Sequence, residues 1–259
     1  MRLDAPIIDV HSHVLPGLDD GAQNLDEALR MCELYVADGV RTVVATPHVW
    51  SGHYDVGSDA IRRGVDELSE ACARRGLDLT ILPGSEVRVR PELLAALAAG
   101  RLMTVGDNGA YLLLELHAQR VPPMGGLLFE LGLRGVQPIL CHPERHTQIW
   151  EHEELLDDLV GRGCLVQVTG ASLLGAYGRR VQRCAEHLLA ARLVHLVASD
   201  AHSPRRRRPL LQRTAGRLIE LGGEALARRL LVANPARIVA GQPLGGPVPS
   251  PVPATTTPR

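Results

Sequence analysis

Two histidines near the start of the chain share one face of a predicted strand. The apolar run at residues 7–10 predicts a β-strand, and side chains two positions apart in a strand point the same way, so His11 and His13 lie together at its end. A loop of Gly, Pro and Asp follows, from which Asp20 can turn a carboxylate oxygen toward the two imidazoles. Imidazole and carboxylate groups in this arrangement bind divalent ions. The spacing therefore predicts a metal site.

Seven short apolar runs would position these groups. Each run is continuous and rich in leucine or β-branched residues, which is typical of parallel strands buried on both faces. Helical patterns lie between the runs, and alternation of strand and helix indicates a parallel α/β sheet. Seven such units in 259 residues favour one domain with an incomplete, TIM-like (β/α)7 barrel. The predicted strands are residues 7–10, 42–46, 79–82, 111–116, 137–141, 164–168 and 194–198.

The helices between the strands are predicted from capping residues and apolar spacing. Asn24 with Glu27 forms a capping box, and Ser58 is expected to cap the next helix. The predicted helices are residues 24–36, a helix from 58, a short helix between 91 and 100, and residues 151–162, 179–191, 210–221 and 224–232.

Metal-binding residue types fall at the carboxyl ends of six of the seven predicted strands. In barrels of this kind that end holds the active site. Carboxylates and imidazoles buried together there are costly unless cations compensate them. Nine nitrogen and oxygen ligands exceed the needs of one ion, so we expect two or three divalent ions. A ligand set without thiolates suits Mn, Zn or Fe, and suits Mg less well. The candidates are His11, His13, Asp20, His48, Glu86, Glu115, His142, Asp200 and His202.

Composition excludes several functions. The formal net charge is -1, which argues against a general nucleic-acid binder. The five cysteines are scattered and odd in number, as in a reduced cytoplasmic protein. None of them is followed six positions later by arginine, so a cysteine-dependent phosphate loop is excluded.

The two ends of the chain complete the predicted organisation. No signal-peptide pattern precedes His11 and no apolar run reaches transmembrane length, so membrane insertion is not expected. Residues 1–244 are predicted to form the domain. Residues 245–259, rich in Pro and Thr, are predicted to be a disordered tail.

Several segments resemble the PHP (polymerase and histidinol phosphatase) superfamily, which has a distorted seven-stranded barrel and a trinuclear metal centre. They are the His-x-His opening, Thr-Pro-His at 46–48, Cys-His-Pro-Glu-Arg at 141–145 and Ser-Asp-Ala-His at 199–202. Within it, three segments resemble the manganese-dependent protein-tyrosine phosphatases of bacterial capsule and exopolysaccharide loci, the CpsB/CapC type. These are His-Ser-His-Val-Leu-Pro-Gly-Leu-Asp-Asp-Gly at 11–21, Pro-Gly-Ser-Glu-Val-Arg at 83–88 and Asn-Pro-Ala-Arg-Ile-Val at 234–239. The resemblance covers residues 7–244.

The resemblance implies a division of the ligands among three ions. The first would be held by His11, His13, Glu86 and Asp200, the second by Glu86, Glu115 and His142, and the third by Asp20, His48 and His202. It further implies that Arg145 binds the phosphoryl group. Asp200 or a neighbouring group is expected to take part in catalysis. The arginine run 205–208 departs from the family pattern, and Arg208 is the candidate within it for a contact with substrate. A metal-activated hydroxide would hydrolyse phosphotyrosine on the tail of a bacterial tyrosine autokinase that serves polysaccharide synthesis.

Three other functions stay open at this point. A PHP hydrolase acting on histidinol phosphate, or on another small phosphoester, would carry the same metal ligands. A regulator could bind phosphotyrosine without turnover, although a pure binder has no need of nine ligands. The arginine run leaves a nuclease open, and the sequence also leaves open a homo-oligomer.

Overall fold

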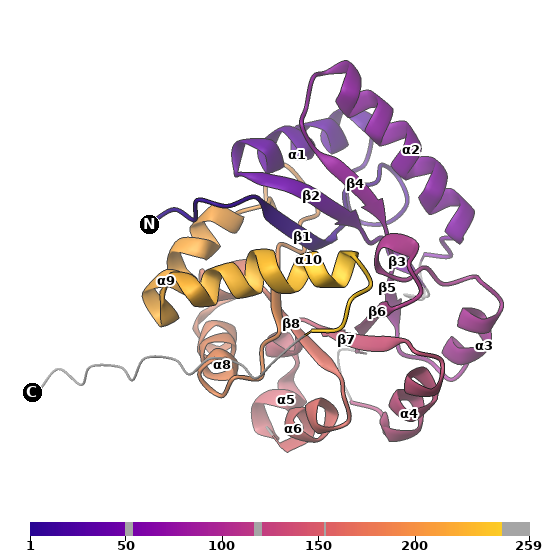
Figure 1. Cartoon of the computed structure of the whole chain (residues 1–259), viewed down its shortest axis with the longest axis vertical. Coiled ribbons are helices and arrows are strands. Elements are labelled where there is room, and N and C mark those ends of the chain that lie inside the picture. The colour runs from indigo at the N-terminus through magenta and orange to yellow at the C-terminus, as the bar shows by residue number, and fades with distance from the viewer. Residues whose placement is uncertain (50–53, 117–120, 153, 245–259) are drawn as a thin grey trace, which may run out of the picture.

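The computed structural model describes residues 1–49, 54–116, 121–152 and 154–244. The tail at 245–259, predicted to be disordered, lies outside the described residues. Helices surround the strands (Figure 1), and the strand pairs are parallel, as predicted. One sheet has the order β1-β2-β4 and the other the order β3-β5-β6-β7-β8-β9. The strands are β1 (Ile7–Ser12), β2 (Val40–Ala45), β3 (His48–Val49), β4 (Thr80–Pro83), β5 (Glu86–Arg88), β6 (Tyr111–Glu115), β7 (Gln137–Cys141), β8 (Leu165–Thr169) and β9 (Leu196–Ala198).

The helices follow the predicted order with some differences. The predicted capping box begins α1, because the Asn24 side chain accepts a hydrogen bond from the backbone N–H of Glu27. The α-helices are α1 (Leu25–Ala37), α2 (Ser58–Arg74), α3 (Leu93–Ala98), α4 (Gly125–Leu133), α5 (Thr147–Glu151), α6 (Glu154–Gly161), α7 (Gly170–Leu173), α8 (Arg179–Ala190), α9 (Leu211–Arg228) and α10 (Asn234–Val239). Short turns η1 (Val105–Asp107) and η2 (Pro143–Arg145) and the π-helical η3 (Arg229–Ala233) complete the elements.

Some helix predictions were wrong. Gly57, not Ser58, is the N-cap of α2, and the Ser58 hydroxyl instead donates to the carbonyl of Gly100. The helix predicted at 151–162 is divided into α5 and α6. The predicted break between helices 210–221 and 224–232 is confirmed as a kink in α9, because Gly222 and Gly223 have non-helical backbone angles. Helix α4 was not predicted, because its apolar residues are not confined to one face and so give no amphipathic period.

Two of the predicted strands, β2 and β4, are each followed after a break by a short strand that was not predicted, β3 and β5 respectively. Pro47 has no N–H to donate, and the chain passes from β2 to β3 there. Gly84 separates β4 from β5 at a close approach, since a Cβ at that position would lie 2.7 Å from Cγ1 of Val44. After these breaks His48 pairs with Glu86 in the parallel register of β3 and β5. The interruptions therefore bring two candidate ligands side by side.

The first strand also meets the segment that follows β9. Ser12 forms a parallel bridge with Ala201, the backbone N–H of His13 donates to the carbonyl of Ala201 at 2.8 Å, and that of Asp200 donates to the carbonyl of His11 at 2.9 Å. These bonds bring the His11–His13 pair to Asp200, although the residues are about 190 positions apart in the chain.

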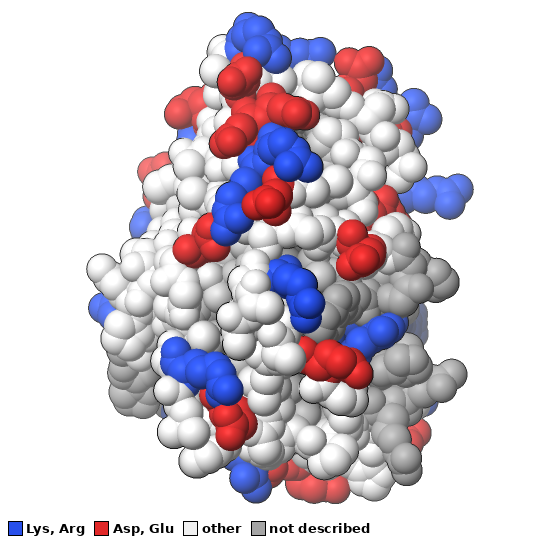
Figure 2. Space-filling view, turned by 90° about the vertical axis from the view of Figure 1, so that its right-hand side faces the viewer, with Lys and Arg blue, Asp and Glu red and all other residues white. Residues whose placement is uncertain are grey.

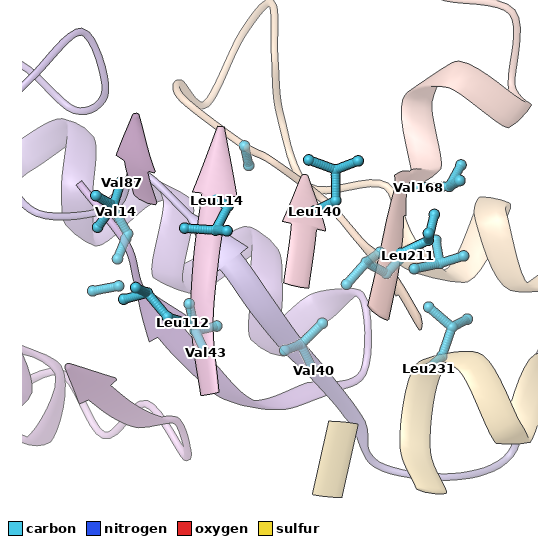
Figure 3. Packing of buried hydrophobic residues seen from close by; sticks show 14 of the residues in the cluster. Val14, Val40, Val43, Val87, Leu112, Leu114, Leu140, Val168, Leu211 and Leu231 are labelled. Atoms are coloured by element: carbon cyan, nitrogen blue, oxygen red, sulfur yellow. The ribbon is translucent and has the colours of Figure 1, made fainter. Parts of the chain in front are cut away.

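The strands are buried on both faces, as their continuous apolar composition predicts. Leu112 and Leu114 of β6 and Leu140 of β7 pack in the large hydrophobic cluster, with helix residues such as Leu211 (Figure 3). The intervening Leu113 belongs to a second buried cluster, made mainly of strand residues. Alternate residues of one strand thus pack on opposite sides of the sheet, which leaves the carboxyl ends of the strands for the polar groups.

The surface carries mixed charge. Figure 2 shows acidic and basic side chains intermingled on the face that includes α2. Among the described residues, no helix has the length and apolar character needed to cross a membrane.

His195, which directly precedes β9, provides a pH-dependent contribution to stability. Its Nδ1 accepts a hydrogen bond from the backbone N–H of Val166 at 3.1 Å, and burial lowers its pKa to about 4. The unfolded chain takes up this proton near pH 6.5, before the folded chain does, so acidification favours unfolding. Between pH 7.5 and pH 5, we expect wild type to lose about 1–2 kcal/mol more unfolding free energy than His195→Gln.

Urea unfolding of both proteins in the presence of EDTA measures this difference, because other titrating groups are common to the pair. An equal loss in the two proteins over this pH range would refute the assignment to His195.

Candidate metal centre

The structure brings all nine predicted ligand residues to one end of the parallel strands. Within the described residues they form four overlapping groups whose nitrogen and oxygen atoms all lie within 4.8 Å of one another in each group. The sharing is wider than the predicted division, because His11, His13, His48 and Glu86 each belong to two groups. The groups are His13, Asp20, His48 and His202; His11, Glu86 and His142; His11, His13 and Asp200; and His48, Glu86 and Glu115.

Glu86 lies at the centre of the cluster. Its Oε1 is 2.8 Å from Nε2 of His142, and its Oε2 is 2.9 Å from Nδ1 of His48. The same Oε2 lies 3.3 Å from Nε2 of His11 and 3.5 Å from Nε2 of His13. Burial alone would raise the pKa of Glu86, but His11 and the other imidazoles lower it well below its usual range. This carboxylate can therefore contact more than one ion.

Two residues that the sequence analysis did not predict orient the paired histidines. Asp19 Oδ2 lies 2.6 Å from Nδ1 of His13 and also accepts the backbone N–H of His48 at 2.9 Å. Gln167 Oε1 lies 2.9 Å from Nδ1 of His11. Each partner engages one ring nitrogen and leaves Nε2 directed at the cluster, as partners of metal-binding imidazoles do.

The Asp19 contact depends on a tight loop that admits no side chain at Gly21. The backbone N–H of Gly21 donates to Asp19 Oδ1 at 2.9 Å. A Cβ at Gly21 would lie 2.1 Å from the carbonyl oxygen of His13. The glycine thus allows the loop after β1 to fold back against the ligands.

Asp200 joins the cluster to two arginines. Its Oδ1 faces Nε2 of His13 at 3.4 Å, whereas its Oδ2 accepts hydrogen bonds from Arg145 at 2.5 Å and from Arg207 at 2.7 Å. Burial alone would raise the pKa of Asp200, but Arg145 and the imidazoles hold it well below its usual range. The Arg145 guanidinium also donates to Oγ1 of Thr169 at 2.7 Å and lies 4.2 Å from the ring centroid of Tyr177. Arg145 is thus held by three contacts.

Two of the candidate ligands adopt a backbone conformation that non-glycine residues rarely use. His142 has φ 38° after β7, and Asp200 has φ 51° after β9. Asp and His tolerate the left-handed region better than most residues, and such strain is typical of functional sites. It turns both side chains toward the cluster immediately after their strands end.

The chemistry of the donor set fits bound cations. Within the described part of the chain, four buried atoms of the candidate ligands make no hydrogen bond: Nδ1 of His48, Oε2 of Glu86, Oδ1 of Asp200 and Nε2 of His202. Burying such atoms without partners is costly, so they indicate that these atoms coordinate metal ions rather than form hydrogen bonds. Burial alone would lower the pKa of His11, but Glu86 and Asp200 raise it to about 9, because the buried carboxylates stabilise positive charge here. Divalent ions would supply that charge.

A pocket of about 160 Å³ opens beside the cluster. Glu115 lies at its wall and is paired with Arg88, whose Nη2 is 3.0 Å from Oε2 of the carboxylate. Cys141 also contributes to the wall, but it is buried with the core, and burial raises its thiol pKa well above the usual range. The lining residues are Arg88, Glu115, Leu116, Cys141, His142, Pro143, Arg145 and His146.

Arg207, not Arg208, lies at the cluster. The backbone N–H of His202 donates to the carbonyl of Arg207, and this turn returns the Arg207 side chain to Asp200. Arg208 is exposed and lies near Asp38. Burial raises the pKa of Asp38, and the charge of Arg208 opposes part of that rise. The structure therefore separates Arg208, predicted to contact substrate, from the other candidate residues.

Comparison with known proteins assigns the chain to a family. Residues 7–240 match the model of the capsular polysaccharide synthesis family CpsB/CapC. The tyrosine-protein phosphatase YwqE of Bacillus subtilis is 37% identical over 202 residues, which are 78% of this chain and 79% of YwqE. The tyrosine-protein phosphatase CpsB of Streptococcus pneumoniae is 28% identical over 243 residues, 91% of this chain and 99% of that protein.

The fold agrees with this assignment. A crystal structure from work on YwqE and CpsB, described as unique metal-dependent tyrosine phosphatases, matches with a TM-score of 0.90 at 34% sequence identity. The match covers 95% of this chain and 99% of that chain. The protein belongs to the CpsB/CapC family of capsular polysaccharide synthesis proteins.

Proposed function

We propose that this protein is a metal-dependent protein-tyrosine phosphatase. The observation that carries the proposal is the arrangement around Asp200, where one carboxylate oxygen faces the imidazole cluster and the other holds Arg145 and Arg207. Cations and guanidinium groups on adjacent sides of one pocket suit the transfer of a phosphoryl group. The phosphatase names of the relatives YwqE and CpsB support the same reaction.

The nine ligand residues are proposed to hold three divalent ions, with Mn²⁺ as the preferred metal. Overlap of the four donor groups supports sharing of ligands, and a donor set of nitrogen and oxygen atoms suits Mn²⁺. Bound there, the ions supply Lewis acidity toward phosphoryl oxygens and lower the pKa of water toward neutrality. Glu86 is proposed to bridge ions, because its two oxygens face different imidazoles.

The remaining side chains bind and orient the substrate. Arg145 and Arg207 are proposed to grip the phosphoryl oxygens, since a guanidinium offers paired donors in one plane. Asp200 keeps both arginines at the edge of the cluster, and Asp19 and Gln167 fix the imidazoles behind it. With Asp200 engaged through both oxygens, we assign it to orienting and ligand roles rather than to proton transfer.

The two sheets are proposed to form one distorted (β/α)7 barrel of the PHP type, in a domain of residues 1–244. The bridge between Ser12 and Ala201 supports closure, because it joins the first strand to the segment after the last. The short strands β3 and β5 are then continuations of β2 and β4, which leaves seven strand positions.

The proposed substrate is a phosphotyrosyl segment of a tyrosine kinase that serves polysaccharide synthesis, and the proposed compartment is the cytoplasm. The family description, capsular polysaccharide synthesis, supports this setting. Five free cysteines, four of them buried, suit a reducing compartment.

Substrate comparison tests the proposed function. With Mn²⁺, we expect a phosphotyrosyl peptide to be hydrolysed with kcat/KM at least about a hundredfold above that for histidinol phosphate, about 3 kcal/mol of discrimination. The reverse preference would assign the protein to the small-molecule phosphatases. Binding of the peptide without release of phosphate would make it a regulator.

Cysteine alkylation tests the metal-dependent route separately. Exhaustive treatment of the folded protein with iodoacetamide is expected to leave turnover within about twofold of the untreated enzyme, because no thiol takes part. Mass spectrometry measures the extent of modification. Loss of turnover in step with alkylation of one cysteine would contradict the proposed chemistry.

A further inference from the structure

A surface groove on α5 and α8 combines an indole ring with cationic side chains. It has a volume of about 480 Å³ and is lined by Trp150, Arg180, Arg183, Cys184 and His187. The three basic residues follow one another at intervals of three and four positions in α8, so they share one face of that helix, and all three are exposed. The Arg180 guanidinium lies 4.6 Å from the ring centroid of Trp150. We call this surface the Trp150 groove.

The groove is connected to the turn that carries Arg145. The indole N–H of Trp150 donates to the carbonyl oxygen of Glu144 at 2.5 Å, and Glu144 directly precedes Arg145. Tyr177, whose ring lies against the Arg145 guanidinium, comes three residues before Arg180. Contacts from both walls of the groove thus lead to Arg145. The groove therefore adjoins the turn that carries Arg145.

Among the described residues, the charge of Arg180 is only partly balanced. Glu151 lies 3.8 Å from Arg180, but the two side chains are more than half exposed, so this pair contributes little. Arg180 is also in the first turn of α8, which contains no acidic residue, although the helix dipole disfavours cations there. Arg180 therefore adds a cation at a helix N-terminus, an end whose dipole itself favours an anion.

We propose that the Trp150 groove binds a second phosphotyrosyl residue of the polypeptide whose first phosphotyrosine enters the metal centre. Guanidinium groups at Arg180 and Arg183 suit a phosphoryl dianion, and the half-buried indole of Trp150 suits the aromatic ring next to it. The inference rests on the proposed phosphatase function and adds a preference for multiply phosphorylated substrates. Occupying both sites at once raises the effective concentration of the scissile residue, so it lowers KM and leaves kcat unchanged.

The test compares peptides of one sequence that carry one or two phosphotyrosines, with p-nitrophenyl phosphate as a substrate too small to reach the groove. The double variant Arg180→Gln/Arg183→Gln removes two charges from the groove. Its control, Arg63→Gln/Arg74→Gln, removes two exposed charges from α2. We expect the groove variant to raise KM about tenfold for the doubly phosphorylated peptide only. The control variant should match wild type on all three substrates.

Several outcomes would overturn the proposal. Identical KM values of the groove and control variants for the doubly phosphorylated peptide would remove the groove from substrate binding. An equal loss on p-nitrophenyl phosphate would mean that the arginines act on the metal centre instead.

Binding of a doubly substituted phosphonate analogue, which cannot be hydrolysed, separates this proposal from the proposed function. If wild type hydrolyses none of the substrates, the phosphatase assignment fails. A difference of about tenfold in Kd between groove and control variants would still support the groove, and equal Kd values would overturn it.

Discussion

Replacing Glu86 by glutamine is expected to lower kcat/KM for a phosphotyrosyl peptide by about a thousandfold and to release bound metal. The fully buried carboxylate is surrounded by the imidazoles of His11, His13, His48 and His142, at 2.8 to 3.5 Å. Glutamine keeps the shape of the side chain but removes the charge that opposes the cations. Kinetics and elemental analysis of the same protein preparation measure both effects.

Thermal unfolding gives an independent test of the Glu86 prediction. Ions that bind the folded state stabilise wild type by about 3 kcal/mol at a hundredfold excess over Kd, so Mn²⁺ should raise its Tm. Glu86→Gln should lose most of that rise, whereas the exposed Glu67→Gln on α2 should keep it. A Glu86→Gln protein with wild-type metal content and wild-type kcat/KM would contradict a bridging role.

Replacing Arg145 by lysine is expected to lower kcat about a hundredfold for every phosphoester tested. The guanidinium is oriented by Asp200 and Thr169 and lies against Tyr177, so its plane is fixed where Arg145 lines the pocket. An ammonium group carries the same charge but cannot donate two parallel hydrogen bonds to phosphoryl oxygens. The loss should therefore appear for p-nitrophenyl phosphate and for peptides alike.

Metal content distinguishes a substrate role for Arg145 from a structural one. Arg145→Lys should bind the wild-type amount of Mn²⁺, because Arg145 is not a ligand. The matched change Arg134→Lys, at an exposed pair with Glu130, should leave kinetics and metal content unchanged. Reduced metal in Arg145→Lys would mean that the arginine acts by holding Asp200 in place.

Much of the site could be predicted because its ligands follow strands. His11 and His13 occupy alternate positions at the end of β1, and the strand geometry alone directs both to one side. Glu115 ends β6, and His142 follows β7 directly. Since parallel strands end at a common edge, these residues converge whatever the details of the intervening helices.

The residues that were missed depend on contacts between distant segments. Gln167 lies within the apolar strand β8, between β7 and β9 in the sheet. Its contact with His11 of β1 joins residues 156 positions apart and has no local signal in the sequence. Asp19 adjoins Asp20, and the local pattern does not distinguish which of the two carboxylates orients His13. Among four successive arginines, the turn from His202 to Arg207 decides which one meets Asp200, and that turn has no distinctive local pattern.

Reconstitution of the metal-free protein tests the central claim most directly. The protein is stripped with chelator, its metal loss is verified by elemental analysis, and Mn²⁺ is then added while bound metal and phosphotyrosyl-peptide turnover are measured together. We expect no turnover without metal, and full turnover once more than one ion per chain is bound, because the donor groups overlap through Glu86 and the paired histidines. Full turnover of the verified metal-free protein would contradict a metal-dependent phosphatase.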